Sequence, residues 1–369
     1  MRLKILVFHP ALATYRVDFF NSVDENFDAK FFFEYKEQAS HKFSKNYLQS
    51  KCTFKSNYLS KGFELFGRSI RFGINSIIRK ERPNVIICSE FGPVTILVFL
   101  HYILTRNRFK LYTICDDSLA NCIDRKGIRS IVRNLVSKNI DGIIFPSHEV
   151  CEWYQNNISV KPKTLILPII HNDKVFRAEL LKSLNIANRN IELCKLINKK
   201  VILYLGRLVE VKNLFFLIKV ISKLKELDWI LVIVGKGEMM NNLKNQVVKS
   251  NITDKVHFTG FKEGPELLAW YNIAQLFVLP STFERFGAVV NEALLAGCPV
   301  LCSEIAGAST LITNENGKLF SPYEEIQLAA MLELMLQDIS PIKGQLSNIR
   351  KSKMPFTFDE KIKELFEKI

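Results

Sequence analysis

Residues 276–299 read LFVLPSTFERFGAVVNEALLAGCP. The apolar run at 276–280 predicts a β-strand, and the segment after Gly287 has the periodicity of an α-helix. A strand that leads into a helix is the repeating unit of a parallel α/β sheet. This pattern places Glu284 on the turn at the carboxyl edge of the strand and Glu292 inside the helix. Ligands of open α/β sheets bind at that edge, so the stretch predicts both a fold class and the position of a site.

The same alternation of apolar runs and amphipathic segments recurs along the chain. In the second half we expect strands at Val201–Leu205, Ile230–Val234, Val256–Phe258, Leu276–Leu279 and Pro299–Cys302, each followed by a helix. In the first half we expect strands at Leu3–Phe8, Ala29–Phe33, Val85–Cys88, Lys110–Cys115 and Gly142–Phe145, with helices at 61–81, 92–105 and 126–140. Residues 165–199 are interpreted as a mostly polar connection.

The chain of 369 residues is too long for one typical hydrophobic core. We therefore predict an α/β protein with two Rossmann-like, doubly wound domains that face each other across a cleft. The first domain is expected at 1–175 and the second at 176–350. Residues 351–369 are expected to end in a short amphipathic helix, for which a return to the N-terminal domain is one destination.

The composition excludes several classes of protein. Hydrophobic residues make up 48% of the chain, which argues against disorder. The most apolar stretch, Val94–Leu104, is shorter than the roughly 20 residues that a bilayer span requires, and we expect it to be a buried helix. Met1–Phe8 has too short an apolar run for a signal peptide and is interpreted as the first strand.

The eight cysteines show no Cys-x-x-Cys pair. Several stand in expected strands or helices, where a free cysteine acts as a small apolar side chain. We therefore expect neither a disulfide framework nor a structural zinc site. We expect a reducing cytoplasmic setting.

The formal net charge of +14 is unevenly distributed. Residues 1–180 contain 27 Lys and Arg against 17 Asp and Glu (+10), and residues 181–369 contain 24 against 20 (+4). A basic N-terminal half indicates an anionic partner. No zinc-finger, RNP or basic-zipper signature accompanies the charge, so nucleic acid is not the expected partner.

A glycine and two cations follow the expected strand Val201–Leu205. Gly206 allows a tight exit from the strand, Arg207 stands on the binding edge, and Lys212 comes just before or within the first turn of the next helix. Two cations beside a helix N-terminus suit a diphosphate, because the backbone N–H groups and the helix dipole add to their charge. A solvated loop with two incidental cations is the alternative for this motif taken alone.

The turn after the next strand contains Gly235 and Gly237. A Gly-x-Gly pair without a third glycine is a weak nicotinamide-cofactor signal. The pair is compatible with close approach of the backbone to a nucleotide, and equally with a plain turn.

Glu284 and Glu292 are eight positions apart. On one helix they would be about 12 Å apart, farther than the roughly 5 to 9.5 Å of glycosidase carboxylate pairs. We therefore expect them to contact different parts of one extended ligand, with Gly287 permitting close approach of backbone N–H groups. A solvated charge is the alternative for either residue alone.

Taken together, these motifs resemble the retaining, nucleotide-sugar-dependent glycosyltransferases of family 4 (group 1), which have the two-domain GT-B fold. The resemblance is strongest over residues 200–320. It rests on Gly206–Asn213, Val234–Glu238, Phe258–Phe261, the Glu-x7-Glu segment and Asn316–Phe320, with further similarity at Phe145–Ser147 and Leu167–Asp173.

The resemblance implies a donor site in the second domain and an acceptor site in the first. The donor-binding residues would be Gly206, Arg207, Lys212, Gly235, Gly237, Glu284, Phe286, Gly287 and Glu292. Arg207 and Lys212 would bind the diphosphate of a UDP- or GDP-sugar, Glu284 the sugar, and Glu292 the ribose. The family needs no metal ion, so none is expected here and no cofactor is implied. Its front-side displacement would let the leaving phosphate accept the proton of the acceptor.

The N-terminal half departs from the commonest pattern of the family. Tyr15 and Arg16 resemble a subgroup that acts on bacterial surface polysaccharides. A histidine often found near the donor sugar is replaced by Cys115-Asp116-Asp117, so Asp116 or Asp117 is expected to face the reaction centre, with a turn or helix-capping role as the alternative. Arg16, with a surface cation as its alternative, and Glu90 are the other candidates for the acceptor side.

The basic segment 61–80 carries aromatic residues on one side, as interfacial helices do. Packing of its apolar residues onto the sheet is the alternative to contact with an anionic membrane.

The implied activity is that of a hexosyltransferase that uses a nucleotide sugar and retains the anomeric configuration. The expected acceptor is a glycan or a polyprenyl-linked glycan in capsule, O-antigen (lipopolysaccharide) or exopolysaccharide synthesis, at the inner face of the cytoplasmic membrane. A sucrose- or starch-synthase-like or small-molecule transferase, and a catalytically silent sugar-nucleotide-binding scaffold, are the alternatives.

Overall fold

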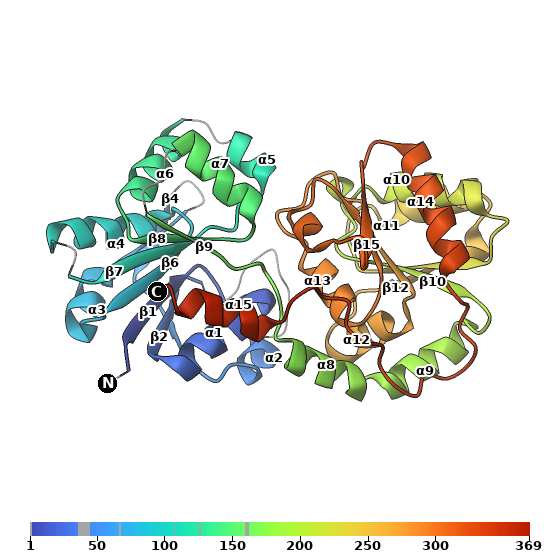
Figure 1. Ribbon diagram of the computed structural model, residues 1–369, viewed down its shortest axis with the longest axis horizontal. Helices are drawn as coiled ribbons and strands as arrows, with labels where there is room; N and C mark the ends of the chain where they lie inside the picture. The colour runs from blue at the N-terminus through green and yellow to red at the C-terminus, as the bar shows by residue number, and fades with distance from the viewer. Residues whose placement is uncertain (1, 36–44, 66–67, 107, 125–126, 159–161) are drawn as a thin grey trace. The chain divides into compact units, whose positions relative to one another are not determined.

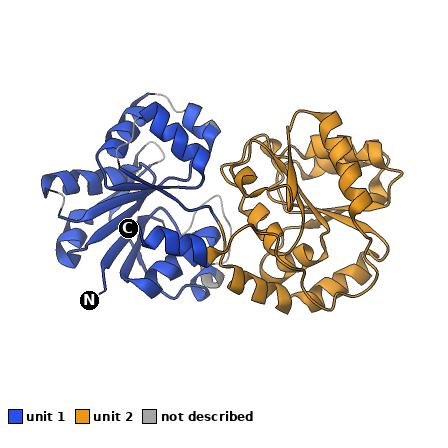
Figure 2. Cartoon of the chain, viewed as in Figure 1, with its two compact units in different colours: residues 1–169, 359–369 blue, residues 170–358 orange. Residues whose placement is uncertain are grey.

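The computed structural model describes residues 2–35, 45–65, 68–106, 108–124, 127–158 and 162–369. The chain forms two compact units (Figure 2). Unit 1 contains Met1–Ile169 and Asp359–Ile369, and unit 2 contains Ile170–Phe358. Each unit is an α/β structure with its own sheet and its own core (Figure 1).

Unit 1 is built on a sheet of seven parallel strands in the order β3-β2-β1-β6-β7-β8-β9. The strands are β1 (Lys4–His9), β2 (Asp28–Phe33), β3 (Ser56–Tyr58), β6 (Val85–Ser89), β7 (Lys110–Ile114), β8 (Gly142–Phe145) and β9 (Lys163–Ile166). The helices are α1 (Thr14–Asn26), α2 (Lys45–Ser50), α3 (Ile74–Glu81), α4 (Pro93–Leu104), α5 (Leu119–Asp124), α6 (Ile128–Lys138), α7 (His148–Ile158) and α15 (Phe358–Phe366).

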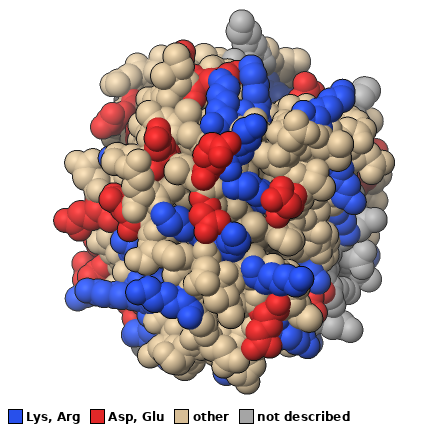
Figure 3. Space-filling view, turned by 90° about the vertical axis from the view of Figure 1, so that its right-hand side faces the viewer, with Lys and Arg blue, Asp and Glu red and all other residues tan. Residues whose placement is uncertain are grey.

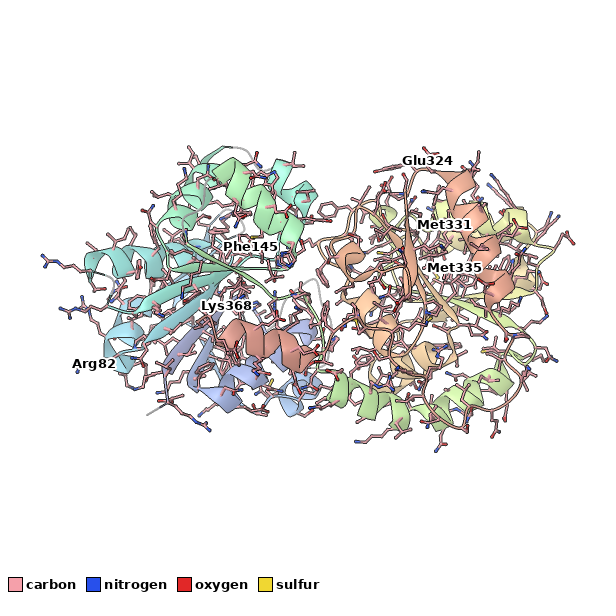
Figure 4. All side chains as sticks on the ribbon, viewed as in Figure 1. Arg82, Phe145, Glu324, Met331, Met335 and Lys368 are labelled. Carbon is pink, nitrogen blue, oxygen red and sulfur yellow. The ribbon has the colours of Figure 1, made fainter. Side chains whose placement is uncertain are left out.

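Helices α3, α4, α6 and α7 pack on one face of this sheet through a single cluster of buried apolar side chains. Phe145, at the end of β8, belongs to that cluster and is fully buried (Figure 4). Helices α1 and α15 lie on the other face (Figure 1), where the rings of Phe27 and Phe366 meet with centroids 4.8 Å apart. Lys110 Nζ and Tyr112 Oη bond the backbone oxygen of Ile369 at 3.0 and 3.3 Å, which fixes α15 on unit 1.

Unit 2 has a sheet of six parallel strands in the order β12-β11-β10-β13-β14-β15. The strands are β10 (Lys200–Leu205), β11 (Trp229–Val234), β12 (Val256–Gly260), β13 (Leu276–Leu279), β14 (Val300–Ser303) and β15 (Gly317–Phe320). The helices are α8 (Asp173–Lys182), α9 (Leu184–Leu193), α10 (Leu214–Ile221), α11 (Met240–Lys249), α12 (Gly264–Ile273), α13 (Ala288–Leu295) and α14 (Glu325–Asp338), with 3₁₀ turns η1 (Glu210–Lys212), η2 (Ser222–Leu224), η3 (Thr253–Lys255) and η4 (Gly307–Leu311). Met331 and Met335 of α14 pack against the apolar core of this unit (Figure 4).

The two doubly wound sheets confirm the predicted fold class, and three local expectations were wrong. The first concerns the helix expected at 61–81. Instead, β4 (Gly62–Leu65) and β5 (Arg68–Arg71) pair as antiparallel strands, and the helix begins only at Ile74. A Cβ on Gly62 would lie 2.1 Å from the carbonyl oxygen of Ile70, so the close pairing of these strands requires glycine there. Phe66, part of the expected apolar face, lies outside the described residues.

The second concerns the connection expected at 165–199, which contains β9, α8 and α9. Asn172 caps α8 by accepting the backbone N–H groups of Lys174 and Val175 at 3.1 and 3.2 Å. In α9, the buried residues Ala187 and Ile191 lie one helical turn apart. The segment was wrongly interpreted as polar, because its buried residues Phe176, Leu180, Ala187 and Ile191 recur at helical spacing.

The third concerns the apolar stretch Val94–Leu104. It is a helix, as expected, but it is buried on one side only, because Leu100, Ile103 and Leu104 of α4 are exposed. Within the described residues, no helix combines the length and the apolar character needed to cross a membrane.

Candidate functional site

The strand order of unit 2 reverses between β10 and β13. The chain leaves β10 toward β11 on one side, whereas β13 pairs with β10 on the other. The loops that follow these two strands leave the same carboxyl edge of the sheet in opposite directions, and ligands of open α/β sheets bind at such a point. The residues predicted from the motifs, 206–212 and 284–287, stand in these two loops.

Glycines bring the loops after β10 and β11 into contact. A Cβ on Gly235, which has φ +149°, would lie 1.9 Å from the carbonyl oxygen of Gly206. A Cβ on Gly237 would lie 2.2 Å from the carbonyl oxygen of Leu208. Both positions therefore need glycine for the packing of the two loops, whether or not a ligand binds there.

Lys212 and Glu284 form an ion pair across the switch point. Lys212 ends the 3₁₀ turn η1, just before α10, and Glu284 stands in the loop between β13 and α13. The N–H of Thr282 donates to the carbonyl of Val211 at 2.9 Å and ties the two loops together. Both charged side chains are largely withdrawn from water, at 11% and 17% exposure, so the pair is stronger than one on an open surface.

Arg207 differs from Lys212, since its side chain is exposed. Within the described residues, the guanidinium of Arg207 has no hydrogen-bond or ion-pair partner. The backbone carbonyl of Arg207 accepts a hydrogen bond from the hydroxyl of Tyr204 at 3.0 Å. The switch point thus carries one exposed planar cation and one cation held by a carboxylate.

Gly287 and Phe286 shape the start of α13. Gly287 has φ +97°, a left-handed conformation that glycine adopts without strain, and it precedes the first helical residue. A Cβ there would lie 3.2 Å from Cγ of Glu284. The ring of Phe286 is buried, so a ligand can meet only its backbone.

Glu292 lies within α13 and is held by two side chains that the motifs did not single out as site residues. The hydroxyl of Tyr271 donates to Oε2 at 2.7 Å, and His171 Nε2 lies 3.2 Å from Oε1. Burial and the charge of Glu292 raise the pKa of Tyr271 well above its ordinary value, so its hydroxyl remains a donor. Each carboxylate oxygen keeps a further lone pair for a ligand hydroxyl. Sequence periodicity marks Tyr271 only as part of a helix, so nothing in the sequence indicated this role.

Unit 1 has its own reversal of strand order, between β1 and β6. Four polar side chains gather at the corresponding ends of β1, β6 and β7: His9, Arg16, Glu90 and Asp116. Arg16 forms an ion pair with Asp116, and the backbone N–H of Asp116 donates to Glu90 Oε1 at 3.0 Å. The predicted acceptor-side residues Arg16, Glu90 and Asp116 are therefore brought together.

Arg16 is 2% exposed, so it is not the surface cation that was the alternative for this position. Tyr15 is half-buried, and the Arg16 guanidinium carbon lies 5.7 Å from the centre of its ring. Glu90 has φ +59°, which a non-glycine residue rarely adopts. Backbone strain of this kind is concentrated at functional sites.

His9 is a member of this cluster that sequence reasoning missed. Its Nδ1 lies 2.8 Å from the carbonyl oxygen of Ala11, which can only accept, so Nδ1 carries the proton. Burial, opposed by the charge of Asp116 and reinforced by that of Arg16, lowers the pKa of His9 to about 4. The imidazole is therefore neutral near pH 7.

The structure separates the two adjacent aspartates. Asp117 is 1% exposed and accepts the hydroxyl of Tyr154 at 3.1 Å, with Arg133 Nη1 3.8 Å away. Asp116 is partly exposed at the sheet edge. Of the two, Asp116 is the one that a ligand can reach.

Glu90, Cys115 and Asp117 form a group whose possible metal-ligand atoms all lie within 4.8 Å of one another. Burial raises the pKa of the Cys115 thiol well above its ordinary value. Arg133 already supplies a cation beside Asp117. The chemistry of these residues does not favour a metal centre here.

Two doubly wound α/β units are the architecture of the GT-B fold. The structure of HepE from Anabaena in complex with UDP matches with a TM-score of 0.70 at 15% identity, over 91% of this chain and 90% of that chain. The chain therefore has the GT-B fold, as predicted. Residues 194–350 match the family model of glycosyl transferases group 1, and this range contains every predicted donor-site residue.

Two relatives are similar over part of the chain. An uncharacterized glycosyltransferase of Methanocaldococcus jannaschii is 35% identical over 143 residues, which are 38% of this chain and 37% of that protein. The alpha-monoglucosyldiacylglycerol synthase of Streptococcus pneumoniae is 30% identical over 213 residues, 57% of this chain and 47% of that protein. The similarity thus spans less than half the length of each of these relatives.

Proposed function

We propose that this protein is a retaining glycosyltransferase that moves a sugar from a nucleotide-diphosphate sugar to a glycan or lipid-linked glycan. The observation that carries the proposal is the arrangement of Arg207, Lys212 and Glu284 at the switch point of unit 2, inside the domain that matches the glycosyltransferase family.

In the proposed donor complex, Arg207 and Lys212 bind the diphosphate. Arg207 presents a planar set of donors to two phosphate oxygens, and Lys212 adds a compact charge. The carboxylate of Glu292, which Tyr271 and His171 orient, accepts hydrogen bonds from the ribose hydroxyls. These two cations neutralise the diphosphate, so we propose that no metal ion is required. UDP is the first candidate for the nucleotide of the donor, since the HepE structure holds UDP. GDP is the second candidate.

The proposed reaction follows from where charge develops. The bond between the anomeric carbon and the phosphate oxygen breaks, and the bond to the acceptor oxygen forms on the same face of the sugar. The proton of the acceptor hydroxyl passes to the leaving phosphate oxygen. Arg207 and Lys212 stabilise the negative charge on the leaving group, while Glu284 and the backbone at Gly287 orient the sugar.

We assign the acceptor side to the cluster of Tyr15, Arg16, Glu90 and Asp116 in unit 1. A buried Arg–Asp pair at a strand edge can exchange hydrogen bonds with acceptor hydroxyls while keeping its geometry. The named product of the Streptococcus relative is a glycosylated diacylglycerol, which supports a lipid-linked acceptor. Synthesis of a bacterial surface polysaccharide at the inner face of the cytoplasmic membrane is the proposed setting, with the protein as a peripheral component.

The decisive experiment begins with thermal shifts of the protein against UDP-, GDP-, ADP- and dTDP-sugars, with and without EDTA. A ligand that binds only the folded state at 100 times its dissociation constant stabilises it by about 2.7 kcal/mol. We expect one base to shift the melt equally with and without EDTA. The donor is then incubated with a lipid-linked glycan acceptor, and NMR of the product gives the anomeric configuration.

Glu284→Gln separates sugar binding from nucleotide binding. We expect this variant to bind the nucleoside diphosphate at least as tightly as the wild type, because Lys212 no longer pairs with Glu284, but to lose turnover. The partly exposed Glu325→Gln should change neither property. The proposal would be contradicted if none of the nucleotide sugars shifted the melting temperature, or if the product had the inverted anomeric configuration. Binding without turnover on any acceptor would favour a silent scaffold.

A further inference from the structure

The acceptor cluster of unit 1 contains three side chains of complementary chemistry. The guanidinium of Arg16 forms an ion pair with Asp116, and its carbon lies 5.7 Å from the centre of the Tyr15 ring. Arg16 is 2% exposed and Asp116 is 14% exposed, so both charges are sheltered from water. The Nε of Arg16 is buried and has no hydrogen-bond partner in the part of the chain that the structure describes. We call Tyr15, Arg16 and Asp116 the first polar set.

A second set of the same three kinds of side chain lies at the end of β2. Glu34 and Tyr35 directly follow this strand, and Arg71 is the last residue of β5. The guanidinium carbon of Arg71 lies 5.2 Å from the centre of the Tyr35 ring. All three residues are half-buried, and the Nε of Arg71 is again buried without a partner among the described residues. We call Glu34, Tyr35 and Arg71 the second polar set.

The antiparallel strands β4 and β5 complete the second polar set. Contact with Tyr35 places Arg71 at the carboxyl end of β2, and β5 packs against α4, the helix that follows Glu90. Burial raises the pKa of Glu34, while the hydroxyl of Ser69 and the charge of Arg71 oppose that rise. The carboxyl group of Glu34 is therefore close to both of these β5 residues.

The two sets lie along one edge of the sheet. The backbone N–H of Glu34 donates to the carbonyl of His9 at 3.2 Å, and that of Tyr35 donates to the carbonyl of Pro10 at 2.9 Å. The segment after β2 thus runs beside the loop that leads to the first polar set. Asp116 follows β7 at the same edge, since these strands are parallel. Three strand spacings of about 4.8 Å separate β2 from β7, so their ends are about 14 Å apart.

Neighbouring opposite charges do not by themselves mark a binding site. Figure 3 shows a face of the molecule on which Lys and Arg are mixed with Asp and Glu, as is usual for solvated surfaces. The polar sets differ from such pairs, because each arginine packs against a tyrosine ring and has a buried Nε without an acceptor. A buried N–H without an acceptor is uncommon in native proteins, and a functional role is one of its recognised causes.

The chemistry of each set suits a neutral sugar. A carboxylate accepts hydrogen bonds from sugar hydroxyls, and a guanidinium donates to hydroxyl and ring oxygens. A tyrosine ring presents an apolar body to the C–H groups of a sugar and a polar tip to its hydroxyls. One positive and one negative charge stand in each set, so neither set favours a phosphate or a carboxylate on the ligand.

We propose that the second polar set is a subsite for a further neutral sugar of the acceptor, so that the acceptor is an oligosaccharide rather than a single sugar. The first polar set holds the sugar that receives the transferred residue, and the second holds a sugar farther along the same glycan. The distance between the strand ends exceeds the width of one sugar ring, so a monosaccharide reaches only the first set. This inference rests on the proposed function, because it defines the acceptor of that reaction.

The test is saturation-transfer NMR of the protein, in the presence of UDP or GDP, with saccharides of one, two and three sugars. The neutral probes contain glucose, galactose, mannose or N-acetylglucosamine in several linkages, and one further group of disaccharides contains glucuronic acid. Glu34→Gln and Arg71→Met each remove one charge from the second polar set. Glu81→Gln is the matched control for the carboxylate, since Glu81 is 12% exposed and pairs with Lys30 in the same unit. Arg79→Met is the control for the arginine, and thermal melts establish that each variant is folded.

We expect at least one neutral disaccharide or trisaccharide to bind the wild type about tenfold or more tightly than its component monosaccharides. Glu34→Gln and Arg71→Met should remove this difference without changing the affinity for the monosaccharide or for the nucleotide. Both controls should keep the difference. Nucleotide binding is measured separately, so a protein that binds the nucleotide but shows no effect of saccharide length contradicts this inference alone. Failure to bind any nucleotide or nucleotide sugar contradicts the proposed function.

Three results would overturn the inference. The first is a wild type that binds no neutral saccharide, or binds the longer ones no better than single sugars. The second is an equal loss for short and long saccharides in Glu34→Gln and Arg71→Met, because the second polar set would then act through the fold. The third is tighter binding of a glucuronic acid disaccharide that Arg71→Met abolishes, because the set would then recognise an anion.

Discussion

The ammonium group of Lys212 lies on the carboxylate of Glu284, although the two residues are 72 positions apart in the chain. The pair exists because β10 and β13 are adjacent parallel strands whose following loops meet at the switch point. This pair keeps both side chains in place at the edge of the sheet. A diphosphate that binds here must compete with Glu284 for Lys212.

Lys212→Met is expected to weaken the binding of UDP by about tenfold or more, because it removes a charge-assisted hydrogen bond worth about 1.5–3 kcal/mol. Lys219→Met is the matched control, since Lys219 is an exposed lysine that pairs with Glu325. Titration calorimetry of both variants with UDP measures the effect. Equal dissociation constants for the two variants would remove Lys212 from the diphosphate site.

Tyr271→Phe deletes only the hydroxyl that holds Glu292. We expect unfolding to be easier by about 1–2 kcal/mol, because a buried hydrogen bond to a carboxylate is lost. We also expect UDP to bind several-fold more weakly and 2′,3′-dideoxy-UDP to be unaffected, since that analogue lacks the hydroxyls that Glu292 would accept. Equal weakening of both ligands would show that Tyr271 acts through the fold rather than through Glu292.

Asp116→Asn and Asp117→Asn are expected to have different effects. Asp117 is buried beside Arg133 and Tyr154, so its replacement should lower the free energy of unfolding by about 3 kcal/mol. Asp116→Asn should reduce turnover about tenfold or more without changing the dissociation constant of the donor. Thermal melts, turnover and calorimetry on both variants test this; normal turnover in Asp116→Asn would exclude that carboxylate from the reaction.

His9 predicts a dependence of stability on pH. Its pKa is lowered from 6.5 to about 4 in the folded protein, so the unfolded chain binds a proton more readily between these values. Stability must therefore fall as the pH falls from about 6.5 to about 4, by up to about 3 kcal/mol from this residue. His9→Gln should flatten that part of the curve.

Urea unfolding of the wild type and His9→Gln across this pH range provides the measurement. The difference between the two curves isolates His9 from the carboxylates and from the other histidines. A difference that does not change with pH would mean that His9 is not held neutral in the native state.

The sequence predicted the fold class because the strands are continuous apolar runs, each followed by a segment of helical period. The prediction was wrong in segments whose composition and whose spacing of apolar residues indicate different structures. Strands β4 and β5 contain apolar residues that also fit a helical spacing, and the close approach of Gly62 to Ile70 is visible only in the structure. In α8 and α9, apolar residues at helical spacing alternate with charged and amide residues, and the segment was interpreted as a polar connection.

The motifs placed the candidate donor residues in the loops where the structure has them, since loop position follows from the strands on either side. They did not reveal His9, His171 or Tyr271. Each of these side chains acts through a partner distant in the chain, as Tyr271 does through Glu292. The exposure of α4 was also hidden, because an apolar sequence does not show whether a neighbour covers it.

The sequence by itself determined two α/β units and the residue types at their strand ends, because hydrophobic period and turn chemistry are local properties. The tertiary structure alone decided which of those residues meet. It paired Lys212 with Glu284 and Arg16 with Asp116, and it turned Asp117 inward while Asp116 stayed at the edge. Strand order sets these contacts, and strand order results from packing over the whole of each unit.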